Sequence, residues 1–235
     1  MTSTVEPEIG QARRRKEDEH LVTGRTRWTD NLVLPGMLHM AILRSPFAHA
    51  RITSIDTSEA RQRPGVVAVL TGADASPEQG SLPCAWVITP DMKIPPAPSL
   101  AVDTVNFAGE AVAVVIARSA YEAHDALEAI DVDYDDLPVV LDLADAARDG
   151  ADLVHPDLGT NVSATWTFDS AEAGTGGDVE QAIRDAEVVV ERTFRQQRLI
   201  PAFMEPRSVV VDPTGPQITV CSATQVPHIP KIMLA

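Results

Sequence analysis

The chain has few aromatic residues, little positive charge and only two cysteines, and each shortage limits what kind of protein it can be. Aromatic side chains make up 4% of the 235 residues, so the core has to be built mainly from Val, Ala, Leu and Ile. With 19 basic against 34 acidic residues and a net charge of −15, the chain lacks the positive charge that nucleic-acid binding requires. Cys84 and Cys221 form neither a CxxC motif nor a disulfide framework, which fits a reducing cytoplasm.

Long apolar segments are also missing. The longest run, residues 111–117, is far shorter than the roughly 20 residues of a membrane-spanning helix. The N-terminal residues are polar and contain no apolar core of a signal peptide, and the basic cluster at residues 13–16 is followed at once by acidic residues. We interpret residues 1–18 as a flexible arm of a cytoplasmic protein.

Most common catalytic motifs are absent as well. The histidines form no HExxH or other zinc spacing, and the chain has no GxSxG nucleophile turn and no Walker loop. The glycine-rich residues 174–177 lack a strong preceding strand and the GxGxxG spacing, so we interpret them as part of a flexible linker over residues 172–177. The aspartates of residues 131–136 alternate as they do on a solvated strand edge, an interpretation that we prefer to a metal site.

What the sequence does contain is a series of short apolar segments separated by Gly and Pro. They predict strands at residues 37–44, 50–56, 66–71, 85–88 and 131–134. Residues 111–117 are apolar on both faces, which predicts a central strand covered on both sides. A capping box of Ser119 and Glu122 predicts a helix, and its buried face should carry Ala120, Ala123, Leu127 and Ile130. Residues 19–140 should therefore form one α+β domain.

The C-terminal part has weaker patterns, and we divide it into a linker over 141–176 and a second, incomplete domain over 177–235. A helical turn is predicted at 142–147, a β region from residue 188, and a hairpin around a Pro-Gly turn between 208–211 and 218–221. Asp178 caps a helix whose buried face should carry Val179, Ala182, Ile183 and Ala186. Pro227 should open a last helix that is too short to be stable alone, with an apolar face of Ile229, Ile232 and Met233.

Two polar residues of the C-terminal part are candidates for function. Gln225 follows a predicted strand and precedes a predicted helix, the place where α/β proteins put ligands. Its amide carries donors and an acceptor, and the alternative is a buried amide with satisfied hydrogen bonds. Glu205 lies between Met204 and Pro206, where a structural acid paired with Arg207 is the simpler interpretation.

Eight segments, in order, resemble the large, molybdopterin-binding subunit of the xanthine dehydrogenase and aldehyde oxidase family. They are RKED at 15–18, LVTGR at 21–25, PGMLH at 35–39, LRSPFAHARI at 43–52, GEAVA at 109–113, DYDDLP at 133–138, MEPR at 204–207 and TQVPH at 224–228. The resemblance implies an α/β hammerhead domain over 19–140, followed by the start of a molybdenum-cofactor domain. It also implies that Gln225 lies near the apical oxo group of the molybdenum, making Gln225 the one cofactor-binding candidate.

In that family, aldehydes, N-heterocycles or carbon monoxide are oxidised with oxygen taken from water at molybdenum. The resemblance implies a molybdopterin cofactor, expected as the cytosine dinucleotide, with 2Fe-2S clusters and FAD on partner subunits. The segment MEPR at 204–207 is more similar to aldehyde and heterocycle oxidisers than to carbon monoxide dehydrogenases.

The family's general-base glutamate and substrate loops lie beyond the equivalent of Ala235, so this sequence predicts no catalytic residue and no metal ligand of its own. We expect the isolated chain to be inactive, to bind no cofactor alone, and to work with the remainder of the large subunit, an iron–sulfur subunit and a flavin subunit. The alternative is a stand-alone hammerhead module with a structural or binding role, or a degenerate remnant without redox chemistry. A soluble, monomeric and cooperatively melting chain would favour that alternative.

Overall fold

The fold is that of a computed structural model, which describes residues 9–84, 86–170, 174 and 176–234. The chain forms two compact units, one over residues 37–193 and one that combines residues 1–36 with 194–235. Every buried residue among those described lies between Ala41 and Ile130, inside the first unit. Each unit is therefore described by itself.

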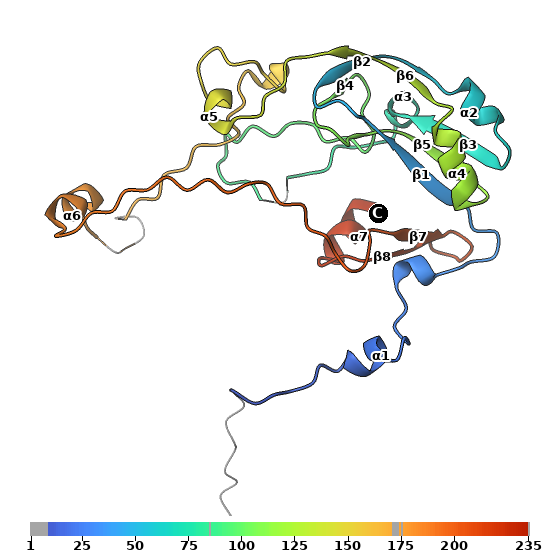
Figure 1. The fold of residues 1–235 in the computed structure, drawn as a ribbon, viewed down its shortest axis with the longest axis horizontal. Helices are drawn as coiled ribbons and strands as arrows, with labels where there is room; N and C mark the ends of the chain where they lie inside the picture. Colours follow the sequence, from blue (N-terminus) through green and yellow to red (C-terminus); the bar gives the residue numbers. More distant parts are fainter. Residues whose placement is uncertain (1–8, 85, 171–173, 175, 235) are drawn as a thin grey trace, which may run out of the picture. The chain divides into compact units, whose positions relative to one another are not determined.

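A three-stranded antiparallel sheet is the centre of the first unit (Figure 1). Its order is β1 (His39–Arg44), β5 (Ala111–Ala117) and β3 (Val66–Thr71). The predicted strands at these positions are confirmed, and β5 has the central place that its apolar sequence predicted. Its alternate residues Ala113, Val115 and Ala117 are completely buried. The predicted cover on both sides is complete on one face only, since Val114 and Ile116 on the other face are half-buried.

Two helices cover one face of this sheet, α2 (Ser58–Gln62) and α4 (Ala120–Leu127). The predicted start of α4 is confirmed, because the Ser119 hydroxyl accepts a hydrogen bond from the Glu122 N–H at 3.2 Å. The reciprocal half of the predicted capping box is wrong, because the Glu122 carboxylate accepts from the Ser119 hydroxyl at 2.9 Å and not from the Ser119 N–H. The predicted buried face is wrong at one position: Ala120 is exposed, and Ala126 is buried with Ala123 because the helix turns that side toward the sheet.

A second three-stranded sheet has the order β4 (Thr104–Val105), β2 (Ala50–Asp56) and β6 (Asp131–Asp136). Its core consists of Ala50, Ala101, Val105 and Val112. The short helix α3 (Gly72–Ala75) starts so close to this core that a Cβ on Gly72 would lie 2.0 Å from the carbonyl oxygen of Ala101. Only glycine allows that approach without displacing backbone.

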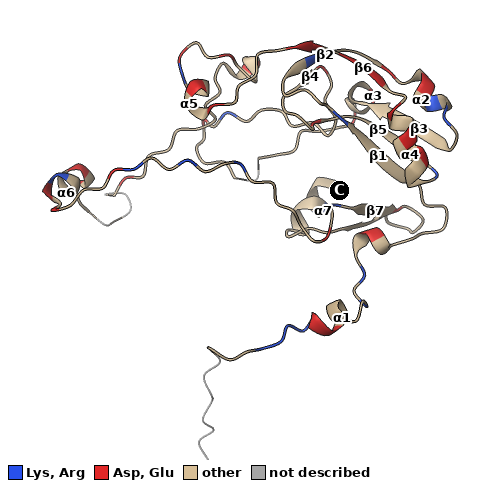
Figure 2. Ribbon diagram, viewed as in Figure 1, with Lys and Arg blue, Asp and Glu red and all other residues tan. Residues whose placement is uncertain are grey.

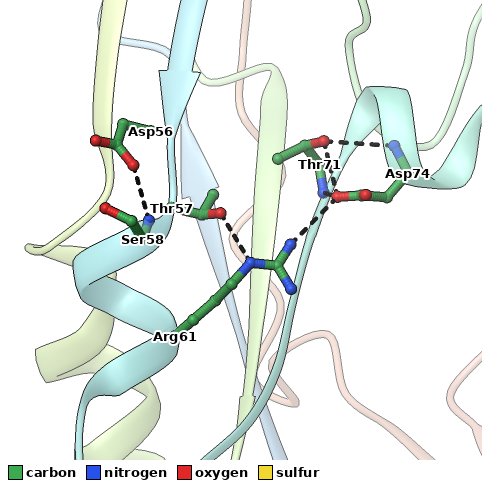
Figure 3. A network of polar contacts seen from close by, with 6 residues as sticks. All are labelled: Asp56, Thr57, Ser58, Arg61, Thr71 and Asp74. Atoms are coloured by element: carbon green, nitrogen blue, oxygen red, sulfur yellow. Dashed lines mark hydrogen bonds and ion pairs between the residues drawn. The ribbon is translucent and has the colours of Figure 1, made fainter.

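A polar network ties the start of α2 to the start of α3 (Figure 3). The Arg61 side chain donates from Nε to the Thr57 hydroxyl at 2.9 Å and lies 3.7 Å from the Asp74 carboxylate. That carboxylate also accepts from the backbone N–H and the hydroxyl of Thr71, each at 2.9 Å. Because these side chains border the solvent, each contact contributes little energy, and together they fix how the two helices begin.

After β6, the described residues of the first unit form three short helices, α5 (Leu143–Ala146), η2 (Pro156–Leu158) and α6 (Val179–Asp185). The helical turn at 142–147 and the Asp178 cap are confirmed. The predicted strand at 85–88 and β region at 188–190 are wrong, because the described residues 86–88 and 188–190 pair with no strand. The predicted buried face of α6 is also wrong, since all of α6 is exposed. Of the predicted flexible linker over residues 172–177, residues 172, 173 and 175 lie outside the described residues.

The second unit consists of α1 (Asp18–Val22), η1 (Thr29–Asn31), the hairpin of β7 (Val209–Asp212) and β8 (Thr219–Ser222), and α7 (His228–Leu234). The predicted hairpin is confirmed, because β7 pairs antiparallel with β8 and Val210 is the partner of Cys221. The Asp212 carboxylate accepts from the N–H and the hydroxyl of Thr214, which tightens the turn. The last helix is also confirmed, since α7 follows Pro227 directly. Residues 1–8 of the predicted arm lie outside the described residues.

Candidate functional site

Gln225 lies in the short segment that joins β8 to α7. The Thr224 hydroxyl accepts a hydrogen bond from the Val226 N–H at 3.2 Å, which turns the chain immediately around Gln225. The first turn of α7 follows, with the Lys231 N–H donating to the Pro227 carbonyl at 3.3 Å. The backbone at Gln225 is therefore held from both sides.

The Gln225 side chain is exposed and accepts or donates no hydrogen bond within the described part of the chain. The alternative of a buried, satisfied amide is therefore wrong. An exposed amide between a strand end and a helix start offers one acceptor and two donors to a polar ligand.

Glu205 connects the two ends of the second unit. Its Oε1 atom accepts a hydrogen bond from the Thr29 N–H at 3.2 Å, across 176 positions of sequence. The predicted pairing with Arg207 is wrong: no ion pair joins the two in the described structure, because the carboxylate is directed to the free N–H groups at the start of η1. Glu205 therefore anchors the N-terminal segment to the segment that precedes the hairpin.

In the first unit, three of the segments that carry the family resemblance contact one another. They are residues 43–52, 109–113 and 133–138, and we call their contact region the Ser45 node. The loop after β1 is fixed because the Ser45 N–H donates to the Glu110 carbonyl and the Gly109 N–H donates to the Ser45 carbonyl, both at 2.8 Å. The Ser45 hydroxyl accepts from the Phe47 N–H at 3.0 Å. Phe47 also packs on Tyr134, with ring centroids 4.9 Å apart.

The same node holds two polar side chains away from water. The His49 ring is buried and lies 2.7 Å from the Pro138 carbonyl oxygen. The buried Glu110 carboxylate accepts from the Asn106 N–H at 2.5 Å. Burial raises the pKa of the Tyr134 hydroxyl, against a smaller opposing effect of the Ser45 hydroxyl. No local sequence pattern marks His49, Glu110 or Tyr134 as functional, and the only signal is that all three lie in segments that carry the family resemblance.

Metal-ligating side chains do not gather anywhere in the described residues: no group of three His, Cys, Asp or Glu could hold an ion. In Figure 2 the ribbon of β6 is coloured red at its acidic residues, which recur along the strand. One of them, Asp133, accepts from the Ser54 hydroxyl at 2.7 Å, as expected of a solvated strand. Within the same residues, no helix is both long and apolar enough to cross a membrane.

Comparison with known families matches almost the whole chain. Residues 23–138 match the a/b hammerhead domain of aldehyde oxidase and xanthine dehydrogenase, and residues 154–235 match the molybdopterin cofactor-binding domain. The chain therefore belongs to the aldehyde oxidase and xanthine dehydrogenase family, and its two matched domains are those of the molybdopterin-binding large subunit. The family resemblance and the predicted hammerhead fold are confirmed.

Relatives with known names support this assignment. The carbon monoxide dehydrogenase large chain of Hydrogenophaga pseudoflava is 34% identical over 94% of this chain and 28% of its own length. The nicotine 6-hydroxylase large subunit of Paenarthrobacter nicotinovorans is 34% identical over 97% of this chain and 27% of its own. The crystal structure of quinoline 2-oxidoreductase from Pseudomonas putida 86 is 37% identical, with a TM-score of 0.82, over 97% of this chain and 28% of that chain. The chain spans only about 28% of the length of these relatives.

Proposed function

We propose that this chain is part of the large subunit of a molybdenum hydroxylase that oxidises an aldehyde or an N-heterocycle and takes the oxygen from water. The single observation that carries the proposal is the match of residues 154–235 to the molybdopterin cofactor-binding domain, which contains Gln225 at the β8–α7 junction. The domain division at 1–18, 19–140, 141–176 and 177–235 belongs to the same proposal.

The proposed substrate is an organic carbon centre rather than carbon monoxide. The segment MEPR at 204–207 favours it, and two of the similar proteins are named for quinoline and nicotine. A carbon monoxide dehydrogenase large chain is equally similar in sequence. Oxidation therefore has to be measured with an aldehyde, an N-heterocycle and carbon monoxide.

The chain's own residues would bind and orient the cofactor. A bound molybdopterin, which we propose as its cytosine dinucleotide, supplies two-electron oxidation chemistry. Gln225 would donate to or accept from its polar groups, and because an amide does not titrate, Gln225 would hold position without moving a proton. The hydrogen bond from Thr29 to Glu205 would keep the ends of the second unit together while the ligand is bound.

The two electrons released by the substrate have to leave the large subunit. We propose that they pass to 2Fe-2S clusters and then FAD on partner subunits, in a cytoplasmic complex that also contains the remainder of the large subunit. Names such as "large chain" and "complex subunit gamma" among the relatives support a complex of several subunits.

The test is to purify the protein from its own cells and measure molybdenum, released nucleotide and product. We expect about one molybdenum per large subunit, cytosine nucleotide on hydrolysis, and ¹⁸O in the product when the reaction runs in H₂¹⁸O. A preparation free of molybdenum, or a product labelled from ¹⁸O₂ instead, would contradict the proposal.

The role of Gln225 is tested in that same enzyme with Gln225→Ala. We expect kcat to fall while the yield of folded protein stays unchanged. Gln217→Ala is the matched control, because Gln217 is an exposed glutamine of the neighbouring β7–β8 turn. Equal activity of both variants would remove Gln225 from the site. For residues 1–235 alone we expect no bound molybdenum, and a stoichiometric amount would overturn that expectation.

A further inference from the structure

Glu205 and Gln225 flank the β7–β8 hairpin at the same end. β7 begins at Val209 and β8 ends at Ser222, and these two residues are partners in the antiparallel pair. Along the chain, Glu205 comes just before Val209, and Gln225 comes just after Ser222. The chain therefore enters the hairpin past Glu205 and leaves it past Gln225, both at the end opposite the turn.

The N-terminal segment of the same unit is attached at Glu205. The short helix η1 lies beside β7, and the Thr29 N–H at its start donates to Oε1 of the half-buried Glu205 at 3.2 Å. The first N–H groups of a helix have no acceptor within it, so a carboxylate from elsewhere in the chain fits there. A hydrogen bond to a charged acceptor is stronger than one between neutral groups, and partial burial limits competition from water.

The hairpin connects this attachment to Gln225. The ladder between β7 and β8 passes a shift of the incoming strand on to the outgoing one. The turn after β8 is set locally, because the Thr224 hydroxyl accepts from the Val226 N–H. The place of the Gln225 amide in the unit therefore depends on where β8 ends, and so on what holds the entry to β7.

We propose that Glu205 is a positioning residue, which fixes the Gln225 amide by tying the entry of the hairpin to the N-terminal segment at Thr29. This inference rests on the proposed function, because it requires that Gln225 contacts the cofactor. A group that orients a reacting centre has to be placed closely, since a displacement of about 1 Å can lower a rate about 100-fold. Glu205 acts through the backbone and moves no proton.

The first experiment is a double-mutant cycle in the complete enzyme, purified from its own host, with kcat calculated per bound molybdenum. We expect Glu205→Ala to lower kcat about tenfold. Because Glu205 acts through Gln225, adding Glu205→Ala to Gln225→Ala should lower kcat no further. Two reductions that multiply would show independent roles and overturn the proposal. Glu191→Ala is the control, since it removes an exposed carboxylate earlier in the chain and should leave kcat unchanged.

Two further variants separate the hydrogen bond from the charge. Glu205→Gln keeps an acceptor oxygen without the negative charge, so it should retain most of the wild-type kcat. Thr29→Pro removes the N–H donor at the first helical position, where proline is tolerated, and the extended backbone of Trp28 suits a following proline. It should lower kcat as Glu205→Ala does. A wild-type kcat in Thr29→Pro, or an equal loss in Glu205→Gln and Glu205→Ala, would contradict the positioning role.

Amide hydrogen exchange tests the same connection without measuring activity. The Thr29 N–H donates to Glu205, and the Val226 N–H donates to the Thr224 hydroxyl beside Gln225. In Glu205→Ala we expect faster exchange of both N–H groups, because the loss of the first bond loosens the exit of the hairpin as well. The Glu191→Ala enzyme should exchange like wild type. If exchange at Val226 is unchanged in Glu205→Ala, Glu205 holds only its own contact and the proposal fails.

The two proposals fail separately. If the wild-type enzyme contains no molybdenum and oxidises none of the substrates, the proposed function has failed. If the wild-type enzyme is active but Glu205→Ala changes neither kcat nor the exchange at Val226, only the positioning role of Glu205 has failed.

Discussion

The two units of this chain differ in how their apolar residues are used. In the residues 37–193 unit, two sheets and two helices bury a core around Val69, Val115 and Ala123. In the other unit, which contains the β7–β8 hairpin and α7, no described residue is buried, although Val209, Val211 and Ile229 are as apolar as the core of the first. The first unit therefore carries its own stabilisation, while the second has local hydrogen bonds but lacks the burial that makes short elements stable.

The largest expected effect comes from a charge in the covered core. Val115→Asp places a carboxylate in the middle of β5, where the valine is completely buried. We expect the free energy of unfolding to fall by about 4 kcal/mol or more, enough to abolish cooperative unfolding. Urea denaturation followed by circular dichroism measures it, with Tyr121→Asp as the exposed control. A cooperative transition at an unchanged midpoint would contradict the assigned core.

A smaller effect is expected at Gly72. In Gly72→Ala the new Cβ would meet the Ala101 backbone, which cannot move like a flexible side chain. We expect a loss of about 1–3 kcal/mol in the free energy of unfolding. Gly80→Ala is the matched control, since nothing lies within 4 Å of a Cβ there and its stability should change by less than about 0.5 kcal/mol. Equal stability of the two variants would remove the close approach between α3 and residue 101.

The network of Figure 3 predicts a pH dependence. Hydrogen bonds from the Thr71 N–H and then the Thr71 hydroxyl lower the pKa of Asp74 from its ordinary 3.8, with a smaller contribution from Arg61. A lowered folded-state pKa stabilises the chain above the unfolded pKa, and that stability is lost as the pH falls through the folded value. Because the group is largely exposed, the contribution is under about 1 kcal/mol.

The measurement compares the Tm of wild type and Asp74→Asn at neutral and at progressively lower pH. The wild type should melt at the higher temperature near neutrality, and the two curves should converge in acid, below the ordinary carboxyl pKa. A difference in Tm that stays constant across the pH range would assign the effect to shape rather than to charge.

The smallest effect is expected in the second unit. Val211→Asp changes an exposed residue of β7, so the stability of residues 1–235 should change by less than about 0.5 kcal/mol. Thermal melting of wild type and Val211→Asp measures the change, with Val115→Asp as the buried comparison in the other unit. A large loss in the 235-residue chain would show that the hairpin is already buried there.

Sequence patterns predicted elements well where the signal is local. The helix after Ser119 and the hairpin around Asp212 depend on caps and turns within a few residues, and both are present. The predicted strand at 85–88 failed over its described residues, because a strand also needs a partner, and that part of the chain finds none. The face of α6 failed for a similar reason: helical spacing says which residues share a side, but not whether anything covers it.

The candidate site was predictable only in part. Gln225 could be placed between a strand and a helix from the sequence, but its exposure could not, because burial depends on residues far along the chain. The contact of Glu205 with Thr29 joins positions 176 residues apart, and no local pattern signals it. The node of Ser45, Glu110 and Tyr134 is equally non-local.

The sequence by itself determined the family, the position of the apolar strands and helix starts, and the identity of Gln225 as the cofactor candidate. Caps, turns and alternating apolar residues act over a few positions, so they can be recognised in one dimension. Only the tertiary structure decided the strand order β1–β5–β3 and which face of that sheet α2 and α4 cover. These depend on which distant segments pack together, and that choice is made by burying apolar area across the whole fold.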